Sequence, residues 1–362
     1  MHKEAWMTKL KVAIAGCGRI SVSYADAFKK LADEIEVVYA VDKVPEKARE
    51  FAAQFGCSYG TDIAEIYGKG VDVVHLCLPH DLHAPMAIDA MEHGINVLTE
   101  KPMALTLQDA DRMIETSERT GMKLGCIFQT RYNETVQDLK KRYEAGEFGL
   151  VRSARSYLSW YRPDSYYDAS DWKGTWEHEG GGTLIDQAIH SMDRVRYILG
   201  SDIDWVEGSI HNHMHPTRAV EDSAEAAVRF KNGCIYNLYS CNYYGFDSPI
   251  NIEFCGEKGR FGLIQDVGYT WFGKEYTEYR EVNKQESVGK DYWGTTHVMQ
   301  LADFYKSVRD GLPVAVDGLE GRKTLELVKA IYLSSLSGGK RITFPFEDHK
   351  IMKEEVLAHW GK

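Results

Sequence analysis

The chain has 362 residues, which leaves room for two domains because a single hydrophobic core usually stops growing near about 250–300 residues. Its 43 basic and 54 acidic residues give a net charge of -11, and the basic residues are scattered, which argues against a nucleic-acid or anionic-membrane surface and favours a small-molecule partner. No run of about 18 apolar residues occurs and Met1–Lys11 lacks the apolar core of a signal peptide, so we expect a soluble, cytoplasmic protein.

A strand, a glycine turn and a helix open the chain. The apolar run 10–15 predicts a strand, and residues 22–31 predict a helix. Between them, Gly16 permits a tight turn and Gly18 leaves room for a pyrophosphate, which the N–H groups at the helix start would bind. Serine stands at position 21 instead of a third glycine, so the match to a dinucleotide-binding turn is partial. The expected cofactor contacts here are Gly16, Gly18, Arg19 and Ile20.

The second predicted strand, 36–41, ends at Asp42. An acidic residue at this place accepts hydrogen bonds from the adenosine ribose hydroxyls and repels a 2′-phosphate, so we expect NAD as the cofactor, with NADP as the less favoured alternative. The neighbouring Lys43 would weaken that discrimination. The alternative is that Asp42 only opens the following turn.

Helical and strand patterns continue to alternate, with helices predicted at 47–55 and 85–93 and strands at 71–78 and 96–99. This alternation predicts a parallel doubly wound sheet. The carboxyl ends of its strands should line the cofactor crevice, which adds the loop 79–83 and the segment 100–102. Lys101 precedes a proline in a backbone of restricted conformation, although a lysine at a strand end is often only a solvated charge. The expected contacts are Leu78, Pro79, His83, Glu100 and Lys101.

Three glycines, 180–182, precede Asp186 and His190. A spacing of four residues puts both side chains on one face of a helix, where they can reach the same substrate. Because glycine carries no Cβ, we expect a cofactor or sugar ring to approach this backbone closely. The alternative is a flexible loop that leads into an ordinary helix with a satisfied polar pair.

In their order and spacing, the glycine turn, the 79–83 loop, Glu100-Lys101-Pro102 and the Gly-Gly-Gly-x-x-x-Asp-x-x-x-His run resemble the glucose–fructose oxidoreductase and inositol dehydrogenase family, Gfo/Idh/MocA. The resemblance spans about 10–346, including a late helix at 319–336. It implies a Rossmann domain, 1–128, followed by an α+β domain, 129–362, with an open, mostly antiparallel sheet that often mediates dimers, tetramers or higher homo-oligomers. It also implies dehydrogenase chemistry on sugars and cyclic polyols; several relatives oxidise glucosides at C3, some with a retained, recycled nicotinamide.

The family's catalytic residues fall on Lys101, Asp186 and His190, and its cofactor contacts extend to Gln129. A histidine with an ordinary pKa of about 6.5 suits removal of a hydroxyl proton at neutral pH, so His190 is our candidate base. Lys101 would stabilise the developing alkoxide, and Asp186 would bind a neighbouring hydroxyl or orient Lys101. The alternative is that Lys101 is the base, with a lowered pKa. Arg131 is either near this site or in a structural ion pair.

Aromatic and charged residues alternate between 157 and 176. Aromatic faces match the C–H faces of pyranose rings, so this segment is the candidate substrate wall. The alternative is a core loop or subunit interface. We expect a neutral sugar, inositol or glycoside, although Arg155 and Lys173 would also suit a sugar phosphate. The expected substrate contacts are Lys101, Tyr161, Arg162, Trp172, Trp176, Asp186 and His190.

Three histidines at 211, 213 and 215 alternate along a strand-like run and raise the hypothesis of a zinc site. No fourth ligand is apparent and the family chemistry needs no metal, so we expect none. The cysteines stand singly, mostly in apolar runs, which predicts reduced core residues.

The rest of the sequence predicts strands of an antiparallel meander, a polar surface excursion over 274–290 and an amphipathic helix over 295–309. The strands are expected at 204–212, 224–230, 235–241, 250–256 and 260–265. An apolar face on such a sheet favours an oligomer. Two other functions stay open: a sugar-sensing regulator that binds NAD(H) without turnover, and a glycosidase with transient NAD oxidation. The sugar and the oxidised carbon cannot be assigned from these residues.

Overall fold

The computed structural model describes residues 9–280 and 296–361, which form two compact units. Among the described residues, unit 1 holds 9–104, 109–129 and 296–321. Unit 2 holds 105–108, 130–280 and 322–361. The sequence analysis placed a single boundary after residue 128, whereas the structure returns 296–321 to unit 1 and assigns 105–108 to unit 2.

Unit 1 contains a six-stranded sheet in the order β3-β2-β1-β4-β5-β6, all parallel. This is the doubly wound order, so the predicted Rossmann fold is confirmed. Val12, Ala13 and Ile14 of the first strand are fully buried, because helices cover both faces of such a sheet. The strands are β1 Leu10–Ala15, β2 Ile35–Val41, β3 Ser58–Gly60, β4 Val73–Leu76, β5 Asn96–Thr99 and β6 Leu124–Cys126.

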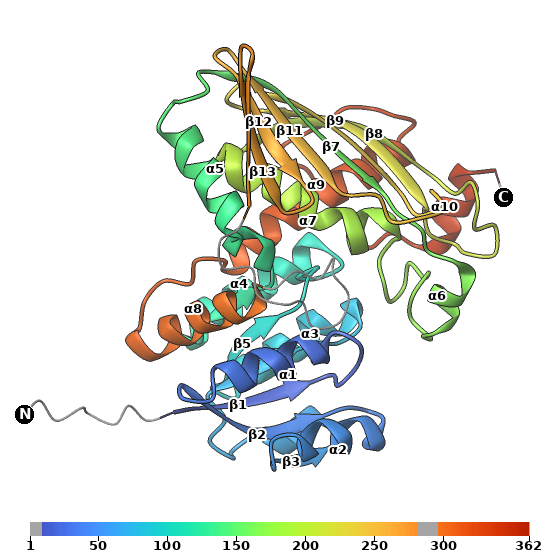
Figure 1. The fold of residues 1–362 in the computed structure, drawn as a ribbon. Coiled ribbons are helices and arrows are strands. Elements are labelled where there is room, and N and C mark those ends of the chain that lie inside the picture. Colours follow the sequence, from blue (N-terminus) through green and yellow to red (C-terminus); the bar gives the residue numbers. More distant parts are fainter. Residues whose placement is uncertain (1–8, 281–295, 362) are drawn as a thin grey trace, which may run out of the picture. The chain divides into compact units, whose positions relative to one another are not determined.

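The helices of unit 1 include one from late in the chain (Figure 1). α8 packs on α1, where Phe304 and Tyr305 join Tyr24 and Phe28 in one buried apolar cluster. This burial is the physical reason that residues 296–321 belong to unit 1. The helices are α1 Ser21–Lys30, α2 Pro45–Ala53, α3 His80–Glu92, α4 Leu107–Thr120 and α8 His297–Asp310, with a short turn η1 Ile63–Ile66.

α3 begins earlier than expected. The sequence analysis started this helix at residue 85 and treated 79–83 as a loop, but Pro79 caps a helix that starts at His80. Pro85 lies inside it. A proline this close to the helix start removes one intrahelical bond, and it does not end the helix. The 79–83 segment is therefore the first turn of α3.

Unit 2 is built on a nine-stranded sheet in the order β14-β13-β12-β11-β7-β10-β9-β8-β15. Among the described strands of this sheet, only β7 and β10 pair in parallel, so the predicted mostly antiparallel sheet is confirmed. The strands are β7 Val151–Ser159, β8 Ile203–His211, β9 Ser223–Phe230, β10 Ile235–Cys241, β11 Asn251–Gly256, β12 Arg260–Ile264, β13 Val267–Phe272, β14 Glu275–Tyr279 and β15 Ile342–Thr343.

Four of these strands, including the short β15, were not expected from the sequence. β7 lies partly in the aromatic segment, and β13 extends the meander beyond the last expected strand. β14 lies in residues that we interpreted as a polar excursion. Four of the five residues of β14 are exposed, so its polar composition hid a strand at the sheet edge. The rest of that excursion, from residue 281, lies outside the described residues.

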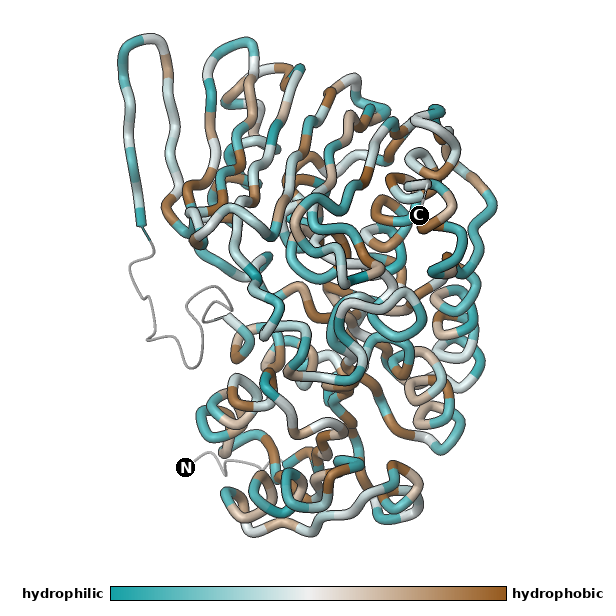
Figure 2. Tube along the Cα trace, turned by 90° about the vertical axis from the view of Figure 1, so that its right-hand side faces the viewer, coloured by the Kyte–Doolittle hydropathy of each residue, from teal (hydrophilic) through white to brown (hydrophobic). Residues whose placement is uncertain are grey.

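Helices cover one face of the unit 2 sheet, with α5, α7 and α9 against it (Figure 1). Hydrophobic segments concentrate in the strands and inner helices, and the turns between them are hydrophilic (Figure 2). The helical elements are η2 Gln129–Tyr132, α5 Glu134–Glu144, α6 Asp164–Asp168, η3 Leu184–Ala188, α7 Ile189–Leu199, α9 Gly318–Leu336 and α10 Lys353–His359. No helix in the described ranges is both long and apolar enough to cross a membrane.

A buried ion pair holds α7 to the start of unit 2. Arg131 donates through Nε and Nη2 to the two carboxylate oxygens of Asp193, at 2.8 and 2.6 Å. The two side chains are 3% and 0% exposed. Thr324 of α9 adds a hydrogen bond to the same carboxylate at 2.8 Å. The interpretation of Arg131 as part of a structural ion pair is therefore confirmed.

Replacing Asp193 by asparagine should destabilise the protein by about 3–5 kcal/mol, because it leaves the Arg131 charge buried without its counter-charge. Urea unfolding would measure the loss. The matched control is Glu257→Gln, which removes the exposed Arg152–Glu257 pair and should cost about 0–1 kcal/mol. Equal effects of the two substitutions would contradict the role given to the buried pair.

Candidate functional site

The glycine turn after β1 is shaped by a close backbone contact. Gly16 has a φ of +95°, and a Cβ built on it would lie 2.1 Å from the carbonyl oxygen of Cys77. Its N–H donates to the carbonyl of Val41 at 2.8 Å. At Gly18, by contrast, a Cβ would meet no protein atom within 4 Å, so open space lies beside that backbone. This is the room that a bound pyrophosphate requires.

Asp42 lies directly after β2, as the sequence predicts for a residue that selects the cofactor. Its carboxylate accepts hydrogen bonds from the N–H groups of Cys17 and Val44, both at 2.8 Å. Asp42 therefore joins the glycine turn to the end of β2. These bonds use one lone pair on each carboxylate oxygen, and a carboxylate can accept further bonds from ribose hydroxyls. A dinucleotide fits this combination of open turn, helix start and carboxylate.

Two of the other predicted cofactor residues hold the backbone at the strand ends. The ring nitrogens of His83 lie 2.7 Å from the carbonyl oxygen of Pro102 and 3.0 Å from that of Leu78. Glu100 is buried and accepts a hydrogen bond from the Tyr24 hydroxyl at 3.0 Å. These contacts position the backbone around Lys101. Direct contact of His83 and Glu100 with a nicotinamide stays a prediction.

The remaining predicted cofactor residues differ in exposure. Arg19 is exposed, Ile20 and Lys101 are half-buried, and so are Leu78 and Pro79. Gln129 is buried, and its carbonyl accepts the Thr296 hydroxyl at 2.6 Å. Lys101 belongs to unit 1, whereas Asp186 and His190 belong to unit 2, so each is described within its own unit.

The three glycines before Asp186 are packing positions. A Cβ on Gly181 would lie 2.0 Å from the Tyr332 hydroxyl, and one on Gly182 would lie 2.0 Å from the carbonyl oxygen of Glu221. The sequence analysis expected a ligand to approach this backbone. Protein atoms fill the space beside Gly181 and Gly182, so the expectation that a ligand approaches the backbone there is wrong.

The Glu221 carboxyl anchors this glycine segment. It accepts the N–H groups of Gly182 and Leu184 at 2.8 and 3.0 Å and the Tyr332 hydroxyl at 2.9 Å. Burial raises the pKa of Glu221 to about 7. Sequence reasoning missed Glu221, because nothing in its spacing links residue 221 to residue 182.

Asp186 and His190 lie on one helical segment in unit 2. Residues 184–188 form a π-helical turn, and α7 continues from Ile189. Four residues are close to a full turn in either helix type, so the expected shared face is retained. π-helical turns occur often at functional sites.

Three side chains donate hydrogen bonds to the Asp186 carboxylate. Its Oδ2 atom accepts hydrogen bonds from the Tyr166 hydroxyl at 2.8 Å, Lys173 Nζ at 2.8 Å and Gln187 Nε2 at 2.5 Å. Lys173 Nζ also reaches Glu179 Oε1 at 3.1 Å. The sequence analysis noted Lys173 as a charge in the aromatic segment and did not link it with Asp186.

The aromatic segment divides into exposed and buried residues. Tyr161 is 45% exposed, and Trp172 is half-buried. Trp176 is 1% exposed, and its indole N–H donates to the carbonyl of Ala219. Arg162 is 3% exposed and pairs with Asp247 at 2.9 Å. Burial therefore argues against substrate contact for Trp176 and Arg162, and leaves Tyr161 and Trp172 as the accessible candidates.

The three histidines at 211–215 do not share one face. β8 ends at His211, whose ring stacks on that of His213 with centroids 5.2 Å apart. His215 instead lies 3.0 Å from Asp222 Oδ2 and 2.7 Å from the carbonyl oxygen of Arg162. In the parts of the chain that the structure covers, no three His, Cys, Asp or Glu side chains gather as metal ligands would.

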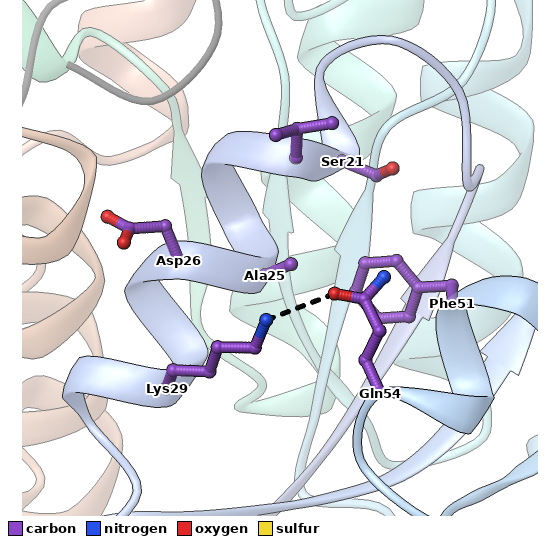
Figure 3. Close-up of a pocket in the computed structure, with 7 residues that line it drawn as sticks. Ser21, Ala25, Asp26, Lys29, Phe51 and Gln54 are labelled. Atoms are coloured by element: carbon purple, nitrogen blue, oxygen red, sulfur yellow. Dashed lines mark hydrogen bonds between the residues drawn. The ribbon is translucent and has the colours of Figure 1, made fainter.

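A cavity of about 180 Å³ lies between α1 and α2 (Figure 3). Ala25 and Phe51 line its apolar part, and Lys29 of α1 bonds the amide of Gln54, just after α2, at 3.1 Å. It holds no cluster of groups suited to catalysis. We assign it no role in the chemistry.

Two family models match consecutive parts of the chain. Residues 10–128 match the oxidoreductase family with an NAD-binding Rossmann fold, and 136–262 match the GFO/IDH/MocA C-terminal domain. Together they cover most of both units.

Two enzymes and one solved structure illustrate the similarity. Myo-inositol 2-dehydrogenase of Thermotoga maritima is 28% identical, with 88% of this chain and 94% of the relative aligned. D-glucoside 3-dehydrogenase of Escherichia coli is 27% identical, over 93% and 99%. The WlbA dehydrogenase of Bordetella pertussis, solved with NADH and UDP-GlcNAcA, is 28% identical over 94% and 99%, with a TM-score of 0.84.

Gly16→Ala should weaken NADH binding by about 10-fold or more, because the backbone strain of about 1–3 kcal/mol and the Cys77 contact would distort the turn. Fluorescence titration would measure the dissociation constant. Gly56→Ala is the matched control, since Gly56 also has a positive φ, +66°, but an added Cβ there meets nothing within 4 Å. An unchanged NADH affinity in Gly16→Ala would contradict the assignment.

His215 should make the stability of the protein depend on pH. Both of its ring nitrogens face acceptors, and the hydrogen bond with Asp222 raises its pKa above 6.5. A raised histidine pKa gives stability that is complete below the unfolded pKa and is lost as pH rises through the folded pKa. Urea unfolding between pH 6 and 9 should show a loss on the order of 1 kcal/mol in the wild type.

The variant for this test is His215→Gln, which cannot carry the charge and should lose that part of the pH dependence. Exposed His178→Gln should keep it. The same pH dependence in His215→Gln and the wild type would disprove the assignment.

Proposed function

The chain belongs to the GFO/IDH/MocA oxidoreductase family, and on that premise we propose that it oxidises a secondary hydroxyl of a sugar, glycoside or cyclic polyol to a ketone with NAD as hydride acceptor. The observation that carries the proposal is the combination of a dinucleotide-type turn in unit 1 with Asp186 and His190 on one helical segment in unit 2. The relatives named as inositol and glucoside dehydrogenases support the substrate class. We propose C3 of a glucoside as the carbon that is oxidised. Oxidation at this carbon is compatible with a cofactor that stays bound between turnovers.

In this proposal, His190 takes the proton of the reacting hydroxyl while the C–H bond on the same carbon breaks. NAD, when bound, accepts the hydride, so the alcohol loses two electrons and becomes a ketone. Lys101 stabilises the negative charge that develops on the oxygen. Asp186 accepts a hydrogen bond from a neighbouring hydroxyl and thereby positions the ring.

The charged side chains of the aromatic segment favour a neutral substrate over a sugar phosphate. Arg155 pairs with Glu253 at 2.8 Å, Arg162 with Asp247 at 2.9 Å, and Lys173 with Asp186 at 2.8 Å. A phosphate would have to compete with each of these carboxylates. Tyr161 and Trp172 offer ring faces suited to the C–H groups of a sugar.

NAD is the proposed cofactor and NADP the less favoured one, because the carboxylate of Asp42 would repel a 2′-phosphate. A homo-oligomer is also proposed. Aromatic side chains on the unit 2 sheet, including Tyr157 and Trp271, are 45% and 37% exposed, and a second copy would cover such a face. A cytoplasmic location stays a prediction.

Incubation with NAD and a panel of inositols, aldoses and glucosides should give a rise in absorbance at about 340 nm and a keto product two mass units lighter. His190→Ala should slow single-turnover hydride transfer by about 100-fold or more, with NADH binding unchanged. Rapid hydride transfer in His190→Ala together with its loss in Lys101→Met would make Lys101 the base. Tight NADH and polyol binding without reduction would favour the sugar-sensing regulator.

A further inference from the structure

We propose that Lys173 is a positioning residue for the reaction: its ammonium pairs with the Asp186 carboxylate and holds it in one orientation, as an acceptor for a substrate hydroxyl. The inference rests on the proposed function, since it assigns a partner to one of the residues given a role there. All groups involved belong to unit 2.

Lys173 is a largely buried lysine between two carboxyls. Its side chain is 13% exposed, and those of Asp186 and Glu179 are 11% and 1% exposed. Glu179 is itself fixed, because its Oε2 atom accepts the N–H of Gly174 at 2.5 Å. A lysine withdrawn from water to this extent needs such partners, since burying an unpaired ammonium costs several kcal/mol. The loop 170–180 is therefore folded around this ammonium.

Three donors converge on one oxygen of Asp186. Lys173 Nζ and the Tyr166 hydroxyl both lie 2.8 Å from Oδ2, and Gln187 Nε2 lies 2.5 Å from it. Gln187 is in turn held by the side-chain amide of Asn242 at 3.0 Å. Donors that arrive from separate parts of the chain fix both the position and the plane of a carboxylate.

The charges explain why the lysine matters more than the two neutral donors. Burial opposes the positive charge of Lys173, but the carboxylates of Asp186 and Glu179 raise its pKa well above the ordinary value. Lys173 thus stays an ammonium at all working pH values. Burial raises the pKa of Glu179 to about 7, and the ammonium also pairs with Asp186 at 2.8 Å. Tyr166 and Gln187 also donate to the carboxylate, but only the lysine brings a counter-charge that offsets the cost of burying it.

This pairing gives Asp186 a lysine from its own unit. The sequence analysis considered only Lys101 as a lysine that Asp186 might orient. Lys173 therefore supplies Asp186 with a cationic partner inside unit 2.

The test is a double-mutant cycle with Lys173→Met and Asp186→Asn in the full-length protein. Lys173→Met should lower kcat/KM for the best polyol by about 10- to 100-fold, since it removes a hydrogen bond between charged groups. In the Asp186→Asn background, the same substitution should have little further effect, because Lys173 acts through that carboxylate. Lys173→Arg should restore part of the activity.

Two controls separate this effect from unfolding and from loss of cofactor binding. Lys231→Met replaces a lysine whose side chain is 61% exposed and should leave kcat/KM unchanged. Every variant should bind NADH with wild-type affinity, because the dinucleotide-type turn lies in unit 1. A cooperative thermal unfolding transition would show that Lys173→Met is folded; if it is not, Lys173→Arg and Lys173→Gln take its place in the cycle.

Full activity of Lys173→Met, or effects of Lys173→Met and Asp186→Asn that simply multiply, would overturn the inference. Polyol binding to the NADH complex, measured by calorimetry, provides the same cycle without turnover. If the wild type binds polyols but never reduces NAD, the dehydrogenase proposal fails, and the calorimetric cycle still decides the role of Lys173.

Discussion

The segment of unit 2 that carries Asp186 and His190 depends on how one buried carboxyl, that of Glu221, holds the backbone before it. Glu221 accepts the N–H groups of Gly182 and Leu184, which are the residues that lead into the π-helical turn with Asp186. Glycine is required at 181 and 182, because a Cβ there would collide with the Tyr332 hydroxyl or the Glu221 backbone. A shift of the backbone at Gly182 and Leu184 would move Asp186 and His190 together. The glycines are thus needed for packing, and the chemistry depends on them indirectly.

The glycine turn of unit 1 is likewise fixed by close packing and by a carboxylate. Gly16 is required by the closeness of the Cys77 carbonyl, whereas Gly18 has open space beside it. Asp42 bonds the turn through the N–H of Cys17, so the residue expected to select NAD also fixes the loop that would bind its phosphates. One carboxylate therefore couples the two halves of the proposed cofactor site.

The polar groups around Asp186 show how a buried carboxylate can be kept in a form useful for binding. Taking a carboxylate out of water disfavours its charge, and an ammonium with further donors compensates for this. Lys173, Tyr166 and Gln187 supply that compensation on a single oxygen. The arrangement favours an acceptor of fixed direction, which suits the recognition of ring hydroxyls.

The sequence by itself determined the doubly wound sheet, because buried parallel strands leave continuous apolar runs and the glycine turn leaves a local signature. It also determined the shared face of Asp186 and His190, since helical periodicity is a local property. It did not reveal the role of Glu221, the pairing of Lys173 with Asp186 or the return of α8 to unit 1. These depend on contacts between residues that are far apart in the chain, such as 182 with 221 and 28 with 304. Only the tertiary structure decided them, because loop folding and burial, and not local periodicity, bring such groups together.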